Sequence, residues 1–161
     1  MNSGLSSIIE YFKTHDWHFT QDEERPVLRM GFSGENGEWR CVAVLERDET
    51  QFAFYSFIPG RAPAKLRTAI SELVTRINYG LFCGSFEMDW CDGEIRMKTS
   101  VLLYGDDLPD ETIHTVVGLN LATVDNFFPA FMKVLYSDAT PEEAIEKAEQ
   151  EQETRSRFEL N

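Results

Sequence analysis

Four acidic residues lie within eight positions of one another, and they are the first candidates for chemistry in this chain: Glu87, Asp89, Asp92 and Glu94. Clustered carboxylates can act as general acids and bases or can bind Mg²⁺. The surrounding residues favour a structural interpretation, because apolar and polar positions alternate on both sides of Asp92-Gly93. Such alternation around Asp-Gly predicts a β-hairpin.

The predicted hairpin has a two-residue type I′ turn at Asp92-Gly93, which requires a positive φ at both residues. In this register one face holds three cross-strand pairs, Cys91 with Glu94, Asp89 with Arg96 and Glu87 with Lys98. The other face pairs Trp90 with Ile95, Met88 with Met97 and Phe86 with Thr99. The acids are therefore interpreted as ion-pair partners and turn residues on a solvated sheet face.

The histidines predict no metal site. His15 and His18 flank Trp17, and they could share a metal only if both side chains converged with a third ligand. An extended backbone at His18 should make them diverge. We expect His114 on the exposed side of a helix.

The cysteines suggest neither a disulfide framework nor a nucleophile. Cys41, Cys83 and Cys91 are odd in number and form no CxxC pattern. Cys41 falls on an inward-facing strand position, whereas Cys91 is the thiol expected to react first. No nucleophile elbow, phosphate-binding loop or zinc motif occurs. We therefore predict a protein that is not an enzyme and needs no cofactor.

Composition excludes several classes of partner. The chain has 161 residues, with 28 acidic and 15 basic side chains and a net charge of −13. Nucleic acids and anionic membrane surfaces are disfavoured, because both are bound through Lys and Arg. No apolar run reaches the ~18 residues of a membrane span. The N-terminus lacks the apolar core of a secretory signal, so we expect a cytoplasmic protein.

Hydrophobic periodicity predicts an α+β fold in the order α-β-β-β-α-β-β-α-α. An antiparallel sheet, made of a three-strand meander and the two-strand hairpin, has helices packed against it. The expected elements are a helix over 3–14, an extended link over 17–19, strands over 27–33, 39–46 and 51–58, a helix over 63–79, the hairpin, and two further helices. The meander should place Phe52 and Phe54 beside Leu45 and Ala43.

Turn and cap residues predict where these elements begin and end. The expected turns lie at Asn36-Gly37 and Asp48-Glu49, a C′ glycine at Gly80 and an N-cap at Asp107. Pro129 should kink the long third helix near Asp125. Thr140 to Glu143 forms a capping box. We expect one α+β domain over 1–138, followed by an acidic helix or tail over 139–161.

The order of elements, together with two segments, resembles the YbjN-like family of bacterial proteins. The segments are RINYGLFCGSFEMDWCDGEIRMKTS and NLATVDNFFPAFMKVLYSDATPEEAIEKA. The resemblance implies structural roles for the motif residues Asn78, Tyr79, Gly80, Gly84, Phe86, Asp92 and Gly93. It also implies a fold similar to the chaperones of type III secretion and a role as a sensory transduction or stress regulator. Members of that chaperone fold are typically homodimers that hold an extended partner segment.

The first functional hypothesis is therefore a homodimeric, non-catalytic regulatory or chaperone-like module that binds a protein or peptide by apolar contacts. The dimer would use the central helix and the strand from Glu94 to Tyr104. The possible interaction surface comprises Arg67, Arg76, Trp90, Arg96 and Lys98. The cations Arg61, Lys65, Arg67 and Arg76 form a basic helix side that could also dock an acidic partner or the second subunit. The alternative is a small-molecule-sensing regulator with an apolar pocket between helices and sheet.

Overall fold

The computed structural model describes the backbone of residues 3–46, 50–105 and 108–159, and the side chains of residues 4–46, 50–105 and 108–150. The helices are α1 (Ser3–Thr14), the short 3-10 helix η1 (Ala64–Leu66), α2 (Arg67–Gly80), α3 (Asp110–Tyr136) and α4 (Pro141–Glu159). The strands are β1 (Phe19–Gln21), β2 (Val27–Ser33), β3 (Glu38–Glu46), β4 (Gln51–Arg61), β5 (Ser85–Met88) and β6 (Glu94–Leu102).

The strands form one antiparallel sheet in the order β1-β2-β3-β4-β6-β5. The predicted meander and its register are confirmed, since Leu45 pairs with Phe52 and Ala43 with Phe54. The hairpin joins the meander through β6. The segment expected to be only an extended link contributes an additional strand, because β1 pairs with β2. The α+β fold predicted from periodicity is therefore confirmed, with six strands in place of five.

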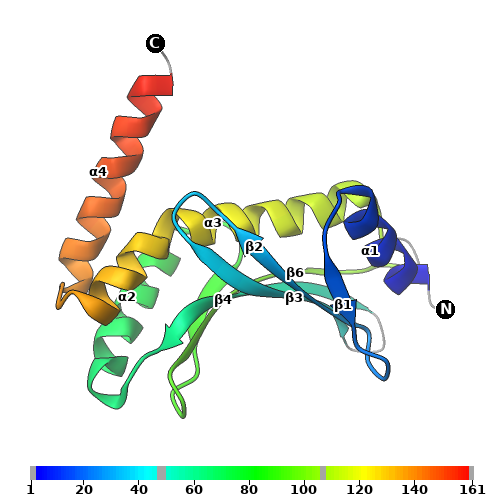
Figure 1. Cartoon of the computed structure of the whole chain (residues 1–161), viewed down its shortest axis with the longest axis horizontal. Coiled ribbons are helices and arrows are strands. Elements are labelled where there is room, and N and C mark those ends of the chain that lie inside the picture. The colour runs from blue at the N-terminus through cyan, green and yellow to red at the C-terminus, as the bar shows by residue number, and fades with distance from the viewer. Residues whose placement is uncertain (1–2, 47–49, 106–107, 160–161) are drawn as a thin grey trace.

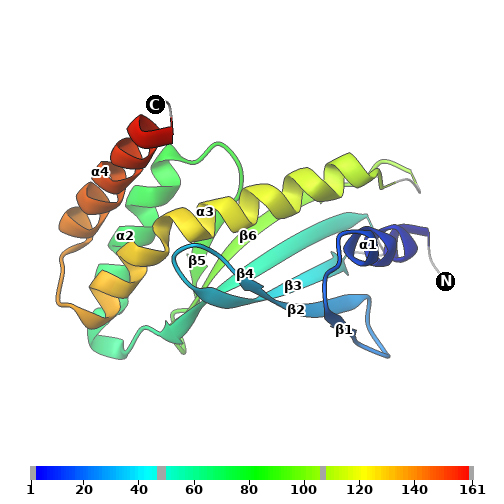
Figure 2. The same cartoon turned by 45° about the horizontal axis from the view of Figure 1, so that its top comes forward.

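Within the described part of the chain, the helices cover one face of this sheet and leave the other face without a helix. α3 crosses the sheet lengthwise, with α1 at one end and α2 and α4 at the other (Figures 1 and 2). Alternate residues of the strands point to α3 and are buried, as in β3, where Trp39, Cys41, Ala43 and Leu45 face inward. Aromatic pairs tie the layers together: Phe12 with Phe54, Trp39 with Phe128 and Phe86 with Phe131.

The proline within α3 creates an attachment point for the β2–β3 turn. Pro129 has no N–H, so it leaves the carbonyl oxygen of Asp125 without its usual helical donor. The side-chain amide of Asn36 donates to this oxygen at 2.9 Å, and the Asp125 carboxylate accepts the backbone N–H groups of Glu35 at 3.1 Å and Asn36 at 2.8 Å. The helix continues to Tyr136.

Two glycines permit the turn to lie this close to the helix. A Cβ on Gly34 would collide with the Asp125 carboxylate and with Trp39, and a Cβ on Gly37 would collide with the ring of Phe128. The predicted turn at Asn36-Gly37 is confirmed, but the connection is four residues long, with Ser33 paired to Glu38. The other predicted turn, at Asp48-Glu49, and the N-cap at Asp107 lie outside the described residues.

The register of the second hairpin differs from the prediction by two residues. Glu87 pairs with Arg96, and Met88 pairs with Ile95. The loop therefore spans Trp90 to Gly93, and only Gly93 has a positive φ, of 77°, so the type I′ turn was wrong. A shift of two residues keeps every side chain on its own face, and for that reason alternation alone does not distinguish the two registers.

The helix ends and caps are confirmed in part. Thr140 and Glu143 bond each other's backbone N–H groups as a capping box should. Gly80 was predicted as a left-handed C′ residue, but it lies within α2 without a positive φ, and the chain leaves the helix in an extended conformation at Leu81. β4 runs beyond the predicted Ile58 to Arg61, with an irregular register between Phe57 and Arg61 around Pro59 and Gly60.

A buried asparagine holds the middle of α3 to the sheet. The side-chain N–H₂ of Asn120 lies 2.9 Å from the carbonyl oxygen of Phe54, 3.2 Å from that of Met97 and 3.2 Å from the hydroxyl of Thr99. The Thr99 hydroxyl in turn donates to the carbonyl oxygen of Val116 at 2.8 Å. Asn120 is fully buried, so its side-chain N–H₂ group donates to acceptors of β4 and β6 where water is excluded, while its Oδ1 has no hydrogen-bond partner among the described residues.

We expect Asn120→Asp to lower the free energy of unfolding by about 3 kcal/mol, because a carboxylate there would be buried beside the carbonyl oxygens of Phe54 and Met97 with no donor to compensate its charge. Urea denaturation monitored by circular dichroism measures this change. The control is Thr115→Asp, which places the same charge on an exposed position of α3 and should change stability by less than about 0.5 kcal/mol. Equal effects of the two substitutions would contradict the role assigned to Asn120.

Candidate functional site

The helix-free side of the sheet, here called the open face, carries the side chains that alternate with the core positions. Two neighbouring rows cross it from strand to strand. One row runs through Gly31, Arg40, Phe57, Arg96 and Glu87, and the other runs through Arg29, Val42, Tyr55, Lys98 and Ser85. Although the chain is strongly acidic, the centre of this face is aromatic and cationic.

Each central arginine lies over an aromatic ring. The guanidinium carbon of Arg40 lies 5.1 Å from the centroid of Phe57, and that of Arg96 lies 4.6 Å from the centroid of Tyr55. Such cation–π contacts hold the guanidinium groups of both arginines against the aromatic rings of the sheet face. Burial, together with the carboxylate of Glu46, raises the pKa of the Tyr55 hydroxyl, so this group remains a hydrogen-bond donor at neutral pH.

Glu87 is the carboxylate within these two rows, and it is shared by two cations. Its oxygens lie 2.9 Å from Arg96 Nε and within hydrogen-bonding range of Lys98 Nζ. Partial burial alone would raise the pKa of Glu87, but the hydrogen bonds from Lys98 and Arg96 outweigh burial and hold that pKa below its usual value. Arg40 differs, since its stacking on Phe57 is accompanied by no ion pair within the described residues.

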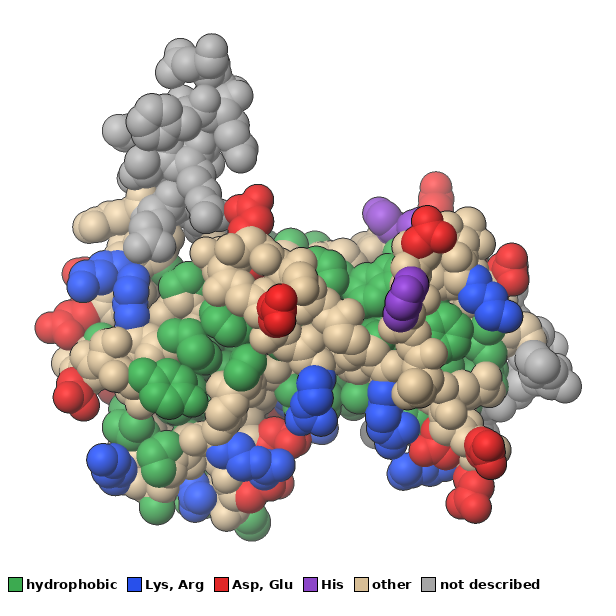
Figure 3. All heavy atoms as spheres, in the orientation of Figure 1, with side chains coloured by type: hydrophobic (Ala, Val, Ile, Leu, Met, Phe, Trp, Pro, Cys, Tyr) green, Lys and Arg blue, Asp and Glu red, His purple; other side chains and the backbone are tan. Residues whose placement is uncertain are grey.

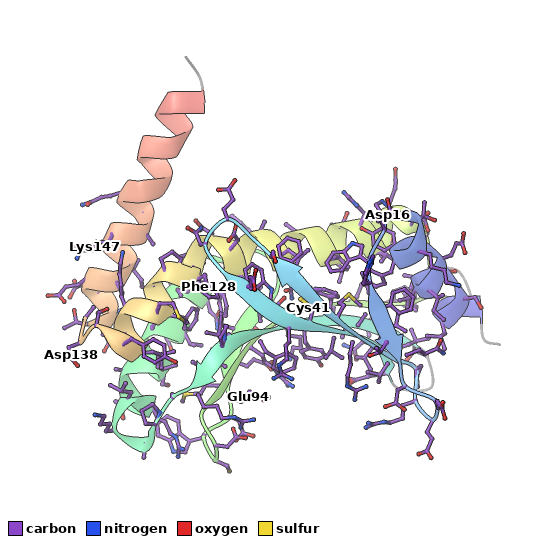
Figure 4. The ribbon with its side chains drawn as sticks, in the orientation of Figure 1. Asp16, Cys41, Glu94, Phe128, Asp138 and Lys147 are labelled. Atoms are coloured by element: carbon purple, nitrogen blue, oxygen red, sulfur yellow. The ribbon has the colours of Figure 1, made fainter. Side chains whose placement is uncertain are left out.

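The open face ends in a groove of about 580 Å³ between the β2–β3 turn and the irregular part of β4. Arg40, Phe57, Pro59, Arg61 and Glu94 contribute to its lining. Figure 3 shows the molecule hollowed on the side away from α3, with Lys and Arg side chains gathered around the hollow. Figure 4 shows Glu94 on this side of the sheet and Phe128 on the opposite side, with α3.

The structure separates the residues of the predicted interaction surface. Arg96 and Lys98 lie together on the open face. Arg67 instead donates to the carbonyl oxygens of Ala62 at 3.2 Å and Trp90 at 3.1 Å, and so holds the hairpin loop to the start of α2. Arg76 pairs with Glu72 one turn away on α2. The side chain of Trp90 is exposed in the hairpin loop.

The predicted basic side of the α2 region is not a continuous cationic surface in the structure. Arg61 belongs to β4 and pairs with Asp92 and Glu94, while Arg67 and Arg76 are occupied within the chain. Asp89, expected opposite Arg96, accepts the backbone N–H of Cys91 at 2.8 Å within the loop. The predicted Glu87–Lys98 contact is confirmed, whereas the Asp89–Arg96 pair is corrected by the two-residue register shift.

For several motif residues, the structure shows a contact that requires that residue type. Asn78 pairs with the outer edge of β5, because its side chain accepts the N–H of Phe86 at 2.8 Å and donates to the carbonyl oxygen of Phe86 at 3.0 Å. Gly84 has a φ of 75° and lies against the backbone of β6, and Gly93 lies against the backbone of Ala62. Tyr79, in contrast, is almost fully exposed, and nothing packs where a Cβ on Gly80 would lie.

The thiols and imidazoles do not assemble a catalytic group. Burial raises the pKa of Cys41 to about 11, so this thiol is protonated at neutral pH, and Cys83 and Cys91 are exposed. His114 is exposed as predicted, but it also bonds Tyr11, whose hydroxyl lies 3.0 Å from His114 Nδ1. No group of three or more His, Cys, Asp or Glu side chains in the described part of the chain could hold a metal ion. Within that part, no helix is both long and apolar enough to cross a membrane.

Arg40, Tyr55 and Phe57 are the site residues that sequence reasoning missed. Their positions alternate with the correctly assigned core residues of β3 and β4, so the pattern already placed them on the opposite face. The missing information was that no helix of the described residues covers this face. Whether a face is covered depends on the side of the sheet on which α3 packs.

Comparisons with known proteins agree with the fold. The model of the YbjN family, described as "putative bacterial sensory transduction regulator", matches residues 5–133. The crystal structure of YbjN from E. coli, described as a "putative transcription regulator", is similar with a TM-score of 0.57, covering 83% of this chain and 90% of that chain. The sequence identity is 10%, so this likeness concerns the fold alone. No curated protein matches the chain.

The shared carboxylate of Glu87 should make stability depend on pH. Because its pKa is depressed below the ordinary 4.5 in the folded state, its ion pairs stabilise the fold above that pH and are lost as the pH falls further. We expect Glu87→Gln to cost up to about 1 kcal/mol at pH 7, and the difference from the wild type to shrink between about pH 5 and pH 3. Urea denaturation of both proteins at several pH values measures this difference in stability. Glu10→Gln, an exposed control on α1, should show no such convergence.

Proposed function

We propose that this chain, which belongs to the YbjN family, is a regulatory module that binds an extended segment of a partner protein on the open face of its sheet. The proposal rests on one observation above all: the open face presents arginines stacked on aromatic rings beside a groove of about 580 Å³. Stacked guanidinium groups and partly buried aromatic rings suit a peptide that offers carboxylates and apolar side chains.

A binding function without catalysis is supported by the way in which the titratable groups are used. Glu87, Asp92 and Glu94 are tied to arginine or lysine side chains, and Asp89 stabilises the loop. The buried thiol of Cys41 is protonated. Each of these groups has a structural role that leaves it poorly suited to transfer a proton to a substrate.

The position of Arg40 offers the sharpest test. We expect Arg40→Gln to reduce retention of the native partner about tenfold, because it removes the outward guanidinium while leaving β3 paired. The measurement is quantitative affinity capture from the native cytoplasm, with the partner identified on the wild-type chain and then followed on each variant.

The matched control is Lys65→Gln, which removes the same charge from an exposed position outside the sheet. It should retain the partner at the wild-type level. Equal loss with both substitutions would point to net charge alone, and equal retention by both would place the partner elsewhere.

The homodimer is part of the same proposal. Tyr79 in the last turn of α2 and Phe82 just beyond the helix are almost completely exposed, and neighbouring exposed aromatic side chains suit a protein–protein contact. Multi-angle light scattering at micromolar concentration should give twice the mass of one chain, and Phe82→Glu should shift the mass to that of a monomer. A monomeric wild-type chain would contradict this part of the proposal.

The alternative regulator, which senses a small molecule, is distinguished by the ligand that stabilises the fold. A metabolite that raises the melting temperature of the isolated chain would support it. Stabilisation only by a protein segment would support a module that binds a protein or peptide.

A further inference from the structure

The outer edge of β6 is only half covered by its neighbour. β5 has four residues and β6 has nine, and their pairing ends where Ser85 meets Lys98. At Gly84, with a φ of 75°, the chain turns away from the continuing ladder. Beyond Lys98, β6 keeps β4 on one side, and no strand of the described chain lies on the other.

The direction of the unpaired backbone groups follows from the bonds made by Asn78. The side chain of Asn78 forms hydrogen bonds with both the backbone N–H and the carbonyl oxygen of Phe86, so these two groups point away from β6. In an antiparallel ladder the flanking pairs are then the hydrogen-bonded ones. Lys98 and Arg96 therefore direct their backbone groups toward β5, and the same alternation directs those of Ser100 and Leu102 toward the uncovered edge.

Two independent bonds agree with this assignment. The carbonyl oxygen of Glu94 accepts from Asp89 on the β5 side, and the N–H of Leu103 donates to Thr50 on the β4 side. The backbone N–H and carbonyl groups of the even-numbered residues of β6 thus point to the β5 side of the strand. Those of the odd-numbered residues bond β4. Among the described residues, no hydrogen bond reaches the outward groups of Ser100 and Leu102.

Within the described part of the chain, the outward backbone groups are bonded at Phe86 of β5 and unbonded on β6 beyond Lys98. On β5 the side chain of Asn78 occupies the outward backbone groups and prevents another strand from pairing there. Ser100 and Leu102 are exposed, and about half of the Leu102 surface, 53%, is accessible. An edge with unpaired donors and acceptors and an exposed apolar side chain is a template for another strand.

A furrow of about 390 Å³ accompanies the uncovered edge. Thr112, Thr115 and Leu119 of α3 line one side, and Val101 of β6 lines the other. Side chains of an added strand would alternate between this furrow and the open face. Methyl groups, hydroxyl groups and the Cys83 thiol line the furrow, and Glu111 is the acid in its lining, so small or β-branched side chains suit it and acidic ones do not.

We propose that an extended segment of a partner protein adds to the sheet along Ser100 to Leu102, pairing with β6 and placing alternate β-branched side chains in the furrow. Main-chain hydrogen bonds hold such a strand, and the pockets for alternate side chains select it. A basic or neutral segment is favoured, because the chain carries a net charge of −13. This surface uses the backbone of the sheet edge and is separate from the arginines of the open face.

The test uses the full-length chain and a defined probe, a fluorescein-labelled peptide acetyl-Lys-Thr-Val-Thr-Val-Thr-Lys-amide, with binding followed by fluorescence anisotropy. Ser100→Pro removes the outward N–H but no bond to β4, and proline is tolerated on strand edges. Ser100→Ala is the matched control, because it removes the hydroxyl and keeps the N–H. We expect saturable binding, a dissociation constant raised at least tenfold by Ser100→Pro, and a change of less than twofold with Ser100→Ala.

Hydrogen exchange of the wild-type chain locates the contact. The amides of Ser100 and Leu102 should exchange rapidly in the free chain and at least tenfold more slowly with the peptide, while that of Val101 is protected in both. Should Ser100→Pro fail to fold, Thr115→Gln narrows the furrow from the exposed side of α3 and should weaken binding at least fivefold.

The proposal would be overturned by no saturable binding at millimolar peptide, by the same dissociation constant for the proline and alanine variants, or by protection elsewhere on the sheet. Protection of the same two amides that grows with protein concentration in the absence of peptide would also overturn it, because a second copy of the chain would then be the occupant.

Discussion

Pro129 leaves the carbonyl oxygen of Asp125 without its helical donor, and Asn36 of the β2–β3 turn provides the replacement at 2.9 Å. The Asp125 carboxylate completes the contact by accepting two backbone N–H groups of the same turn. A defect in the helix thereby becomes the point at which the meander is fastened to α3. This contact and the bonds of Asn120, together with the buried apolar side chains of α3, hold the helix on one face of the sheet.

One-sided coverage has two consequences for the sheet. The inward residues of β3 and β4 form an aromatic core with α1 and α3, while their neighbours Arg40, Tyr55 and Phe57 remain partly accessible. At the β5 side the coverage is incomplete in another way, because β5 is shorter than β6. The molecule therefore presents both a side-chain surface and a backbone edge, and each suits an extended polypeptide by a different physical interaction.

The acidic residues near the hairpin show how pairing determines the chemistry that remains available. Arg61, which arrives from the end of β4, takes Asp92 and Glu94, and Glu87 is shared by Arg96 and Lys98. These ion pairs connect the hairpin strands to each other and to the end of β4. Arg40 is stacked on an aromatic ring instead, which explains why the cationic character of this face survives in a chain of net charge −13.

The sequence by itself determined the type of each main element and the face that it buries, because these follow from local periodicity. The pairing of Leu45 with Phe52, the capping box at Thr140 and the inward position of Cys41 are all of this kind. Arg96 and Lys98 could be placed on the polar side of the hairpin for the same reason.

Only the tertiary structure decided which groups meet. A hairpin shifted by two residues has the same buried face, so the sequence pattern could not exclude the wrong partner for Arg96. Asn36 and Asp125 are 89 residues apart, and neither shows a local signal of the other. The open face and the uncovered edge of β6 likewise depend on where α3 packs and where β5 ends, since exposure is a property of the assembled layers and not of any one strand.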